Sequence, residues 1–212
     1  MIIFAGPSLT DRSKSLIAEL GIDLRPPVKR RGIEQLTLSG YKGVITIVDG
    51  VFNQSAAVGH AEIRKALEQG ATVYGLSSMG AIRAWEMRNL GMRGYGQVYS
   101  YFDSMEDFQD DEMALLHGPG PEYMNFSEPM VHFRYCLEQL VLNNTIGGGS
   151  AQDIISFMKN RYFGQRTLNL FVSALDEAGV SSSKSILESF DRYRIKQNDL
   201  ITFLETEAWK SK

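Results

Sequence analysis

The sequence predicts an α/β protein with a small parallel sheet and flanking helices in its N-terminal half, followed by a mostly helical C-terminal lobe. Short apolar runs at 2–5, 43–48 and 71–76 alternate with segments of helical periodicity. This order is typical of strand–helix–strand units with right-handed crossovers. In the second half the strand-like runs give way to helical patterns.

The first elements are short and bounded by turn residues. The IIFA run at 2–5 is β-branched and aromatic and ends at Gly6-Pro7, so we expect a strand and then a turn. The elements expected next are a helix from Ser8 or Thr10 to Leu20, a strand over 22–24, an extended connection at Pro26-Pro27, and a solvated basic loop at 29–31.

The GVITIV run at 43–48 is continuously apolar, as in a strand that is buried on both faces. Apolar residues then recur at helical spacing over 56–68, before Gly70 at a position typical of a helix C-terminus. A strand over 71–76 and a helix over 79–89 complete the predicted α/β pattern.

The C-terminal half contains helix start signals and glycines between helical stretches. Helices are expected over 128–142, from Ser150 onward, over 166–178 and over 182–208. Gly147–Gly149 is the expected hinge. We therefore expect a core domain over residues 1–146 and a helical lobe over 150–212.

Composition excludes several classes of protein. The chain is 43% apolar and 22% charged, with a net charge of −3, which gives no overall electrostatic signature of nucleic-acid binding. No apolar run has the roughly 18 residues of a membrane span. The single cysteine cannot form an internal disulfide. We expect a soluble cytoplasmic protein that binds neither nucleic acid nor membrane.

The most informative stretch is the strand-to-helix turn at Ser78. A serine at such a turn resembles a nucleophile elbow, where helix N–H groups, here those of Met79 and Gly80, would hold an oxyanion. The pattern is partial, because Leu76 stands where G-x-S-x-G has glycine. The alternative is that Ser77 or Ser78 is only a helix cap.

Other polar candidates lie near the same predicted sheet edge. His60 opens a helix that also carries Glu62 and Lys65, and it is either functional or an ordinary hydrogen-bonded histidine. Arg83 either points to this edge or pairs with Glu62 or Glu86. Asp49 follows a buried strand, where it is a functional acid or the acceptor of an Asp-Gly turn.

The acidic run at 103–112 contains six acids and no base. It could bind Mg²⁺ or a basic partner, but such runs are most often solvated. We assign no metal site and no cofactor to the chain.

Several collinear blocks resemble the TfuA proteins, over roughly residues 44–135. The blocks are Val48-Asp49-Gly50-Val51-Phe52, His60-Ala61-Glu62-Ile63, Ser78-Met79-Gly80-Ala81-Ile82-Arg83-Ala84-Trp85-Glu86, Gly91-Met92-Arg93-Gly94-Tyr95-Gly96, Asp110-Asp111-Glu112-Met113-Ala114, His117-Gly118-Pro119 and Glu128-Pro129-Met130-Val131.

The resemblance implies peptide-modification chemistry. TfuA proteins accompany YcaO enzymes, which activate peptide backbone amides with ATP, and the pair installs thioamides. The TfuA component is understood to hydrolyse the C-terminal thiocarboxylate of a ubiquitin-like sulfur carrier, and to help YcaO engage its peptide or protein substrate. The family's proposed serine–lysine dyad places its serine at Ser78.

The chain departs from the family block at the position of the lysine. The family usually has His-Lys-Glu, and this chain has His60-Ala61-Glu62. A variant with weakened or lost hydrolysis, a base at another position, or an introduced lysine-to-alanine substitution would each explain Ala61. Lys65, one helical turn further on, and His60 are the candidate replacement bases.

Three functional hypotheses follow. The first is a thiocarboxylate hydrolase that acts with YcaO and uses Ser78 as nucleophile. The second is a noncatalytic adaptor that docks YcaO with its peptide or carrier, which Ala61 favours. The third is an α/β domain unrelated to the family that binds a small anion at the helix terminus beside Ser78.

Overall fold

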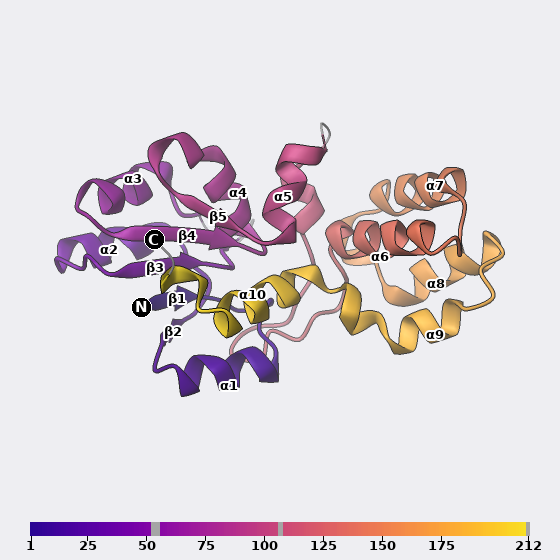
Figure 1. Cartoon of the computed structure of the whole chain (residues 1–212), viewed down its shortest axis with the longest axis horizontal. Coiled ribbons are helices and arrows are strands. Elements are labelled where there is room, and N and C mark those ends of the chain that lie inside the picture. Colours follow the sequence, from indigo (N-terminus) through magenta and orange to yellow (C-terminus); the bar gives the residue numbers. More distant parts are fainter. Residues whose placement is uncertain (52–55, 106–107, 211–212) are drawn as a thin grey trace. The chain divides into compact units, whose positions relative to one another are not determined.

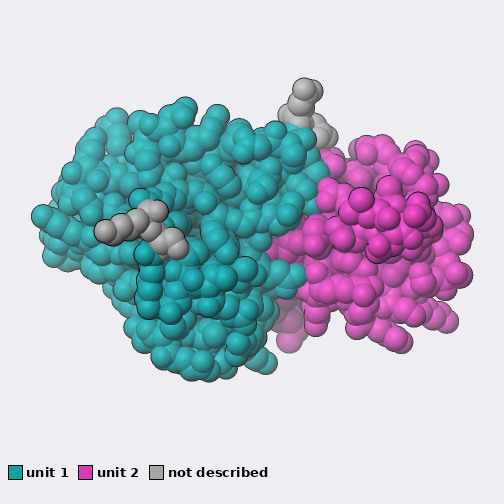
Figure 2. Space-filling model, in the orientation of Figure 1, with its two compact units in different colours: residues 1–108, 120–122, 196–212 teal, residues 109–119, 123–195 magenta. Residues whose placement is uncertain are grey.

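The computed structural model describes residues 1–51, 56–105 and 108–210 (Figure 1). The chain forms two compact units, coloured separately in Figure 2: residues 1–108, 120–122 and 196–212, and residues 109–119 and 123–195. Three residues singled out in the sequence, Phe52 of the first family block and Glu106 and Asp107 of the acidic run, lie outside the described residues.

The first unit contains a parallel sheet with the strand order β2-β1-β3-β4-β5. Its strands are β1 (Ile2–Phe4), β2 (Asp23–Arg25), β3 (Val44–Ile47), β4 (Thr72–Leu76) and β5 (Arg93–Tyr95). Ile2 lies opposite Asp23 on one side and Ile45 on the other. The predicted small parallel sheet is therefore confirmed.

Helices connect the strands and cover both faces of the sheet. They are α1 (Asp11–Glu19), α2 (Gly32–Leu38), α3 (His60–Glu68), α4 (Met79–Glu86), α5 (Gln97–Ser104) and α10 (Ile195–Glu205), with 3₁₀ turns at Arg88–Leu90 and Ala208–Lys210. Ile45, Ile47 and Val73 pack with residues of α2, α3 and α4, whereas Tyr74 and Leu76 pack with α1 and α10. Figure 1 shows α3 and α4 opposite α1 and α10.

The sheet order positions a functional edge. From β1 the chain continues to β2 at one edge of the strand order, whereas from β3 it continues through β4 to β5 at the opposite edge. In doubly wound sheets of this order, ligands bind beyond the carboxyl ends of the strands, where the crossover direction reverses. Here the segments after β1, β3 and β4 occupy this edge.

Some elements of the first unit differ from those expected. α2 and β5 were not predicted, because α2 has only seven residues and the strand Arg93–Tyr95 has no apolar run. α5 was not predicted either, and only its last two residues belong to the acidic run. α3 begins at His60 rather than at residue 56, and α4 ends at Glu86 rather than at 89.

The second unit is helical, as predicted for the C-terminal part of the chain. Its helices are α6 (Met130–Leu142), α7 (Gly148–Lys159), α8 (Leu168–Glu177) and α9 (Ser183–Glu188), with 3₁₀ turns at Asp110–Met113, Phe163–Gln165 and Phe190–Tyr193. Its core contains Phe133, Phe171 and Phe190. The division of the chain expected at residues 146–150 stays a prediction.

The single helix expected over 182–208 is wrong. A 3₁₀ turn at Phe190–Tyr193 separates α9 from α10. Phe190 packs in the core of the second unit, whereas Phe203 packs against the sheet of the first. Periodicity does not distinguish these two cores, so one helix was predicted where there are two.

Throughout the described residues, we find no helix with the length and apolar character to cross a membrane.

Candidate functional site

The turn between β4 and α4 is a tight, strained elbow. Ser77 has φ 64°, and the Ser78 N–H donates to the Leu76 carbonyl at 2.7 Å. A positive φ is uncommon outside glycine and marks a backbone that its surroundings hold in place. Ser78 then occupies the N-cap position of α4. The strained residue of the elbow is therefore Ser77, one position before the predicted nucleophile.

Two glycines allow α4 to start against the sheet. A Cβ on Gly75 would lie 2.0 Å from the Gly80 carbonyl oxygen, and a Cβ on Gly80 would lie 1.8 Å from the Ile47 carbonyl oxygen. Only glycine fits at either position without moving backbone. With Ser78 as nucleophile, the G-x-S-x-G pattern requires a glycine at position 76. In the structure the strained residue of the turn is Ser77, and the glycine two positions before it is Gly75.

The Ser78 side chain is buried, with 4% of its surface exposed, and makes no hydrogen bond that caps α4. The simple capping role considered from the sequence is therefore absent. The Gly80 N–H donates to the Val48 carbonyl at 3.2 Å, so it is already used. Met79 is the first residue of α4, where backbone N–H groups have no acceptor within the helix.

Asp49 ties the end of β3 to the loop after β1. One carboxylate oxygen accepts the Gly6 and Ser8 N–H groups at 2.8 and 2.9 Å, and the other accepts the Ser8 hydroxyl at 2.8 Å. Asp49 and Ser8 are buried. The carboxylate thus holds the loop at the functional edge of the sheet.

Glu62 holds two helix starts together. Its carboxylate accepts the Gly59 N–H at 2.7 Å, at the start of α3, and the Ile33 and Glu34 N–H groups at 3.1 and 3.2 Å, in the first turn of α2. A carboxylate at a helix N-terminus satisfies free donors and complements the helix dipole. The observed contacts of Glu62 are structural.

His60 and Arg83 share one acid. Glu86 Oε2 lies 2.8 Å from His60 Nε2 and 2.5 Å from Arg83 Nη1, and Arg83 Nε donates to the Val58 carbonyl at 3.1 Å. Glu86 is eight residues beyond Ser78, a rise of about 12 Å along a helix. The observed contacts join His60 to Arg83 through Glu86 and do not join either to Ser78.

Ala61 and Lys65 lie on the exposed side of α3, whose buried residues are Ile63 and Ala66. Within the described ranges, Lys65 makes no ion pair with an acid. The side chain of a lysine at position 61 would also project from this exposed side of α3.

Helix α10 contributes contacts that the sequence did not suggest. The Ser77 hydroxyl donates to the Lys196 carbonyl at 2.7 Å. The Asp199 carboxylate accepts the Gln97 and Val98 N–H groups, at 2.8 and 3.0 Å, where α5 begins. The spacing Gly75-x-Ser77 is a sequence signal for the elbow, but no local pattern connects it to residues more than a hundred positions later.

Asp199 predicts a pH-dependent stability. Burial raises the pKa of Asp199 to about 7, although the two backbone N–H groups act to lower it. Between pH 4 and 7 the folded chain keeps a proton that the unfolded chain loses. The contribution of Asp199 to the free energy of unfolding therefore falls as pH rises, by up to about 1.4 kcal/mol per pH unit.

Urea unfolding of the wild type and of Asp199→Asn, from pH 4.5 to 7.5, checks this expectation. The difference in free energy of unfolding between the two should change across the series, with the wild type losing more stability as pH rises. A pH-independent difference would contradict it.

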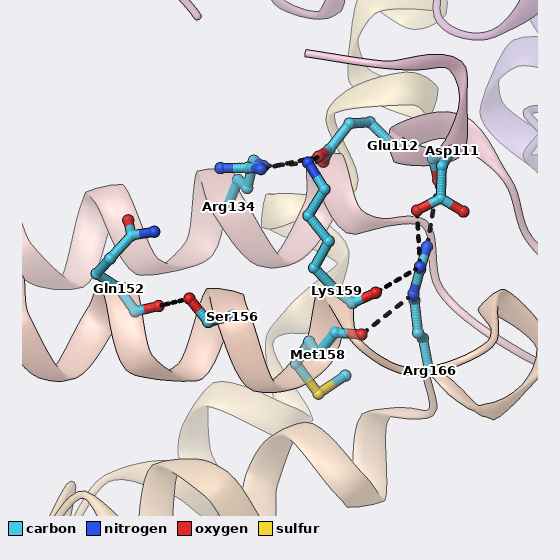
Figure 3. Close-up of polar contacts among 8 residues, drawn as sticks. All are labelled: Asp111, Glu112, Arg134, Gln152, Ser156, Met158, Lys159 and Arg166. Carbon is cyan, nitrogen blue, oxygen red and sulfur yellow. Dashed lines mark hydrogen bonds and ion pairs between the residues drawn. The ribbon is translucent and has the colours of Figure 1, made fainter. Parts of the chain in front are cut away.

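Two acids of the acidic run are paired inside the second unit (Figure 3). Glu112 is fully buried and contacts Arg134 at 2.8 Å and Lys159 at 3.0 Å. Asp111 accepts a hydrogen bond from Arg166 at 2.7 Å. Glu112 is therefore an internal acid, whereas the Asp111 side chain is 42% exposed and pairs with the buried Arg166. In the described part of the chain, no group of three or more His, Cys, Asp or Glu residues could hold a metal ion.

Comparison with known proteins gives one family. No curated protein sequence matches the chain significantly. The model of the TfuA-like protein family matches residues 49–167, more than half of the chain, including the Ser78 elbow and the paired acids of the second unit. The chain therefore belongs to the TfuA-like protein family.

Proposed function

We propose that this chain hydrolyses the C-terminal thiocarboxylate of a ubiquitin-like sulfur carrier and releases sulfide for a partner YcaO enzyme. TfuA-like proteins associate with YcaO enzymes, which activate peptide backbone amides. The observation that carries the proposal is the Ser78 side chain, which stands at the N-cap of α4 without capping it. Cys136 is a poor alternative nucleophile, because burial raises the pKa of its thiol to about 12.

The proposed reaction is acyl transfer through Ser78. Its oxygen attacks the thiocarboxylate carbonyl carbon, the carbon–sulfur bond breaks, and water then cleaves the acyl-serine ester. Overall, R–COS⁻ and water give R–COO⁻ and H₂S. The developing oxyanion would be stabilised by the Met79 N–H and the N-terminal end of α4. Because the Gly80 N–H is bonded to Val48, Met79 is the preferred donor.

His60 and Lys65 are the candidate bases. His60 Nε2 lies 2.8 Å from Glu86 Oε2, and a donor role for Nε2 in this contact would leave Nδ1 free to accept a proton. Lys65 is exposed and has a long side chain. Asp49, Glu62 and Arg83 are proposed to support the site, since their described contacts are made within the fold.

The experiment measures sulfide release from a thiocarboxylated carrier. We expect Ser78→Ala to lower the rate by about 10³-fold or more, while Ser173→Ala, at an exposed serine of α8 in the second unit, leaves it unchanged. His60→Gln and Lys65→Ala then locate the base. Release that survives Ser78→Ala would overturn the proposed nucleophile.

The adaptor function remains the second candidate, because Ala61 occupies the position of the family lysine. Sulfide release that appears only in Ala61→Lys would make position 61 the missing base and this chain an inactive form. A chain that binds carrier and YcaO but releases no sulfide in any variant would be an adaptor. The anion-binding hypothesis required the family resemblance to be coincidental, and family membership removes that premise.

A further inference from the structure

The elbow is tied to a helix that lies outside the family-matched segment. Ser77 and Lys196 are separated by 119 positions, and the hydrogen bond between the Ser77 hydroxyl and the Lys196 carbonyl is buried. The matched segment ends at residue 167. Within the described residues, the Ser77 hydroxyl is thus bonded to a part of the chain that the family model does not cover.

Serine at position 77 provides a hydroxyl group that glycine would lack. A backbone with φ 64° is accessible to glycine without strain, whereas a side chain at this φ costs on the order of 1 kcal/mol. The Ser78 N–H bond to Leu76 restrains the turn from one side. The Ser77 hydroxyl restrains it from the other, at the residue immediately before the proposed nucleophile.

The acceptor on α10 is itself held in place. Leu200, Phe203 and Leu204 pack in the same core as Tyr74 and Leu76 of β4. One helical turn after Lys196, Asp199 bonds the first N–H groups of α5. Lys196 is 1% exposed. Its carbonyl is therefore a fixed point against which the elbow is positioned.

We propose that Ser77 is a positioning residue and that α10 is part of the active site, because the bond from Ser77 to Lys196 sets the direction of the Ser78 hydroxyl. This inference rests on the proposed function. Loss of the bond frees the backbone at residue 77, and rotation there displaces the Ser78 oxygen from the α4 N-terminus. A displacement of about 1 Å at a reacting atom can lower a rate by about 100-fold.

The test uses two readouts on the full-length protein. One is the rate at which a fluorophosphonate labels Ser78, a reaction in which the serine oxygen displaces fluoride from phosphorus. The other is the split of sulfide release into kcat and KM. We expect Ser77→Ala and Ser77→Gly each to lower the labelling rate and kcat by about 10- to 100-fold, with KM nearly unchanged.

A matched control separates positioning from loss of stability. Ser183 is also buried and its hydroxyl also donates to one acceptor, Asp176, in the second unit. Ser183→Ala should lower Tm comparably but leave labelling of Ser78 unchanged. Asp199→Asn, which loosens α10 without touching the elbow, should lower the labelling rate in the same direction as Ser77→Ala.

The outcomes for the two proposals differ. If Ser77→Ala slows labelling but the wild type releases no sulfide, the hydrolase is wrong and the positioning role stands. If Ser78-dependent sulfide release occurs and Ser77→Ala changes neither readout, the positioning role is overturned. The positioning role is also overturned if Ser183→Ala reproduces the fall in both readouts. It is likewise overturned if wild-type Ser78 is not labelled and does not support sulfide release.

Discussion

Gly80→Ala is expected to unfold the first unit or to lower its free energy of unfolding by more than about 3 kcal/mol. A Cβ at this position would lie 1.8 Å from the Ile47 carbonyl oxygen and 2.6 Å from its carbon. Both are backbone atoms of the central strand β3, so neither moves cheaply. Relief of the overlap requires α4 to lift from the sheet, which also displaces Ser78.

The same substitution at Gly148 gives the matched control. Gly148 is the first residue of α7, and a Cβ there meets nothing within 4 Å. Alanine favours a helix over glycine by up to about 1 kcal/mol, so Gly148→Ala should be neutral or stabilising. Urea denaturation followed by far-UV circular dichroism measures both. Equal stability of the two variants would show that α4 does not approach β3 as closely as described.

The predictable part of the fold depends on buried strands. The GVITIV run predicted β3 almost to its ends, because a strand buried on both faces is apolar at nearly every position, here all but Thr46. The edge strand β5 consists of Arg93, Gly94 and Tyr95, which carry no such pattern. Its pairing with β4 is determined by the fold and not by local sequence.

The candidate site was predictable only where its signal is local. The serine at the β4–α4 turn was found from a strand followed at once by a helix. The strain at Ser77 and its bond to Lys196 depend on a contact between distant segments. Asp49 was expected at the sheet edge, but its bonds to Gly6 and Ser8 were not foreseen.

The partners of the acidic run were also not predictable from local sequence. Six acids in ten residues are typical of a solvated segment, yet Glu112 is fully buried. Its partners Arg134 and Lys159 come from α6 and α7, which the spacing of the acids does not reveal. Charge patterning therefore favoured a solvated segment, whereas the structure buries Glu112 between two cations.

The second large prediction concerns buried Glu112 and its two cationic partners. We expect Glu112→Gln to lower the free energy of unfolding of the second unit by about 3–5 kcal/mol. The two carboxylate oxygens of Glu112 accept Arg134 Nε and Nη2 at 2.8 Å each, and Oε1 also contacts Lys159 Nζ at 3.0 Å (Figure 3). The amide has nearly the same shape, but leaves two cations without their shared anion and places an NH₂ group against a donor.

Glu68→Gln is the control with identical chemistry. Glu68 pairs with Arg64 one helical turn away, at 3.5 Å and with both side chains mostly exposed, so its loss should change stability by less than about 0.5 kcal/mol. Combining Glu112→Gln with Arg134→Met should recover part of the lost stability, because one stranded cation is removed with its partner. Equal effects of Glu112→Gln and Glu68→Gln in urea unfolding would mean that the Glu112 cluster is solvated in the folded chain.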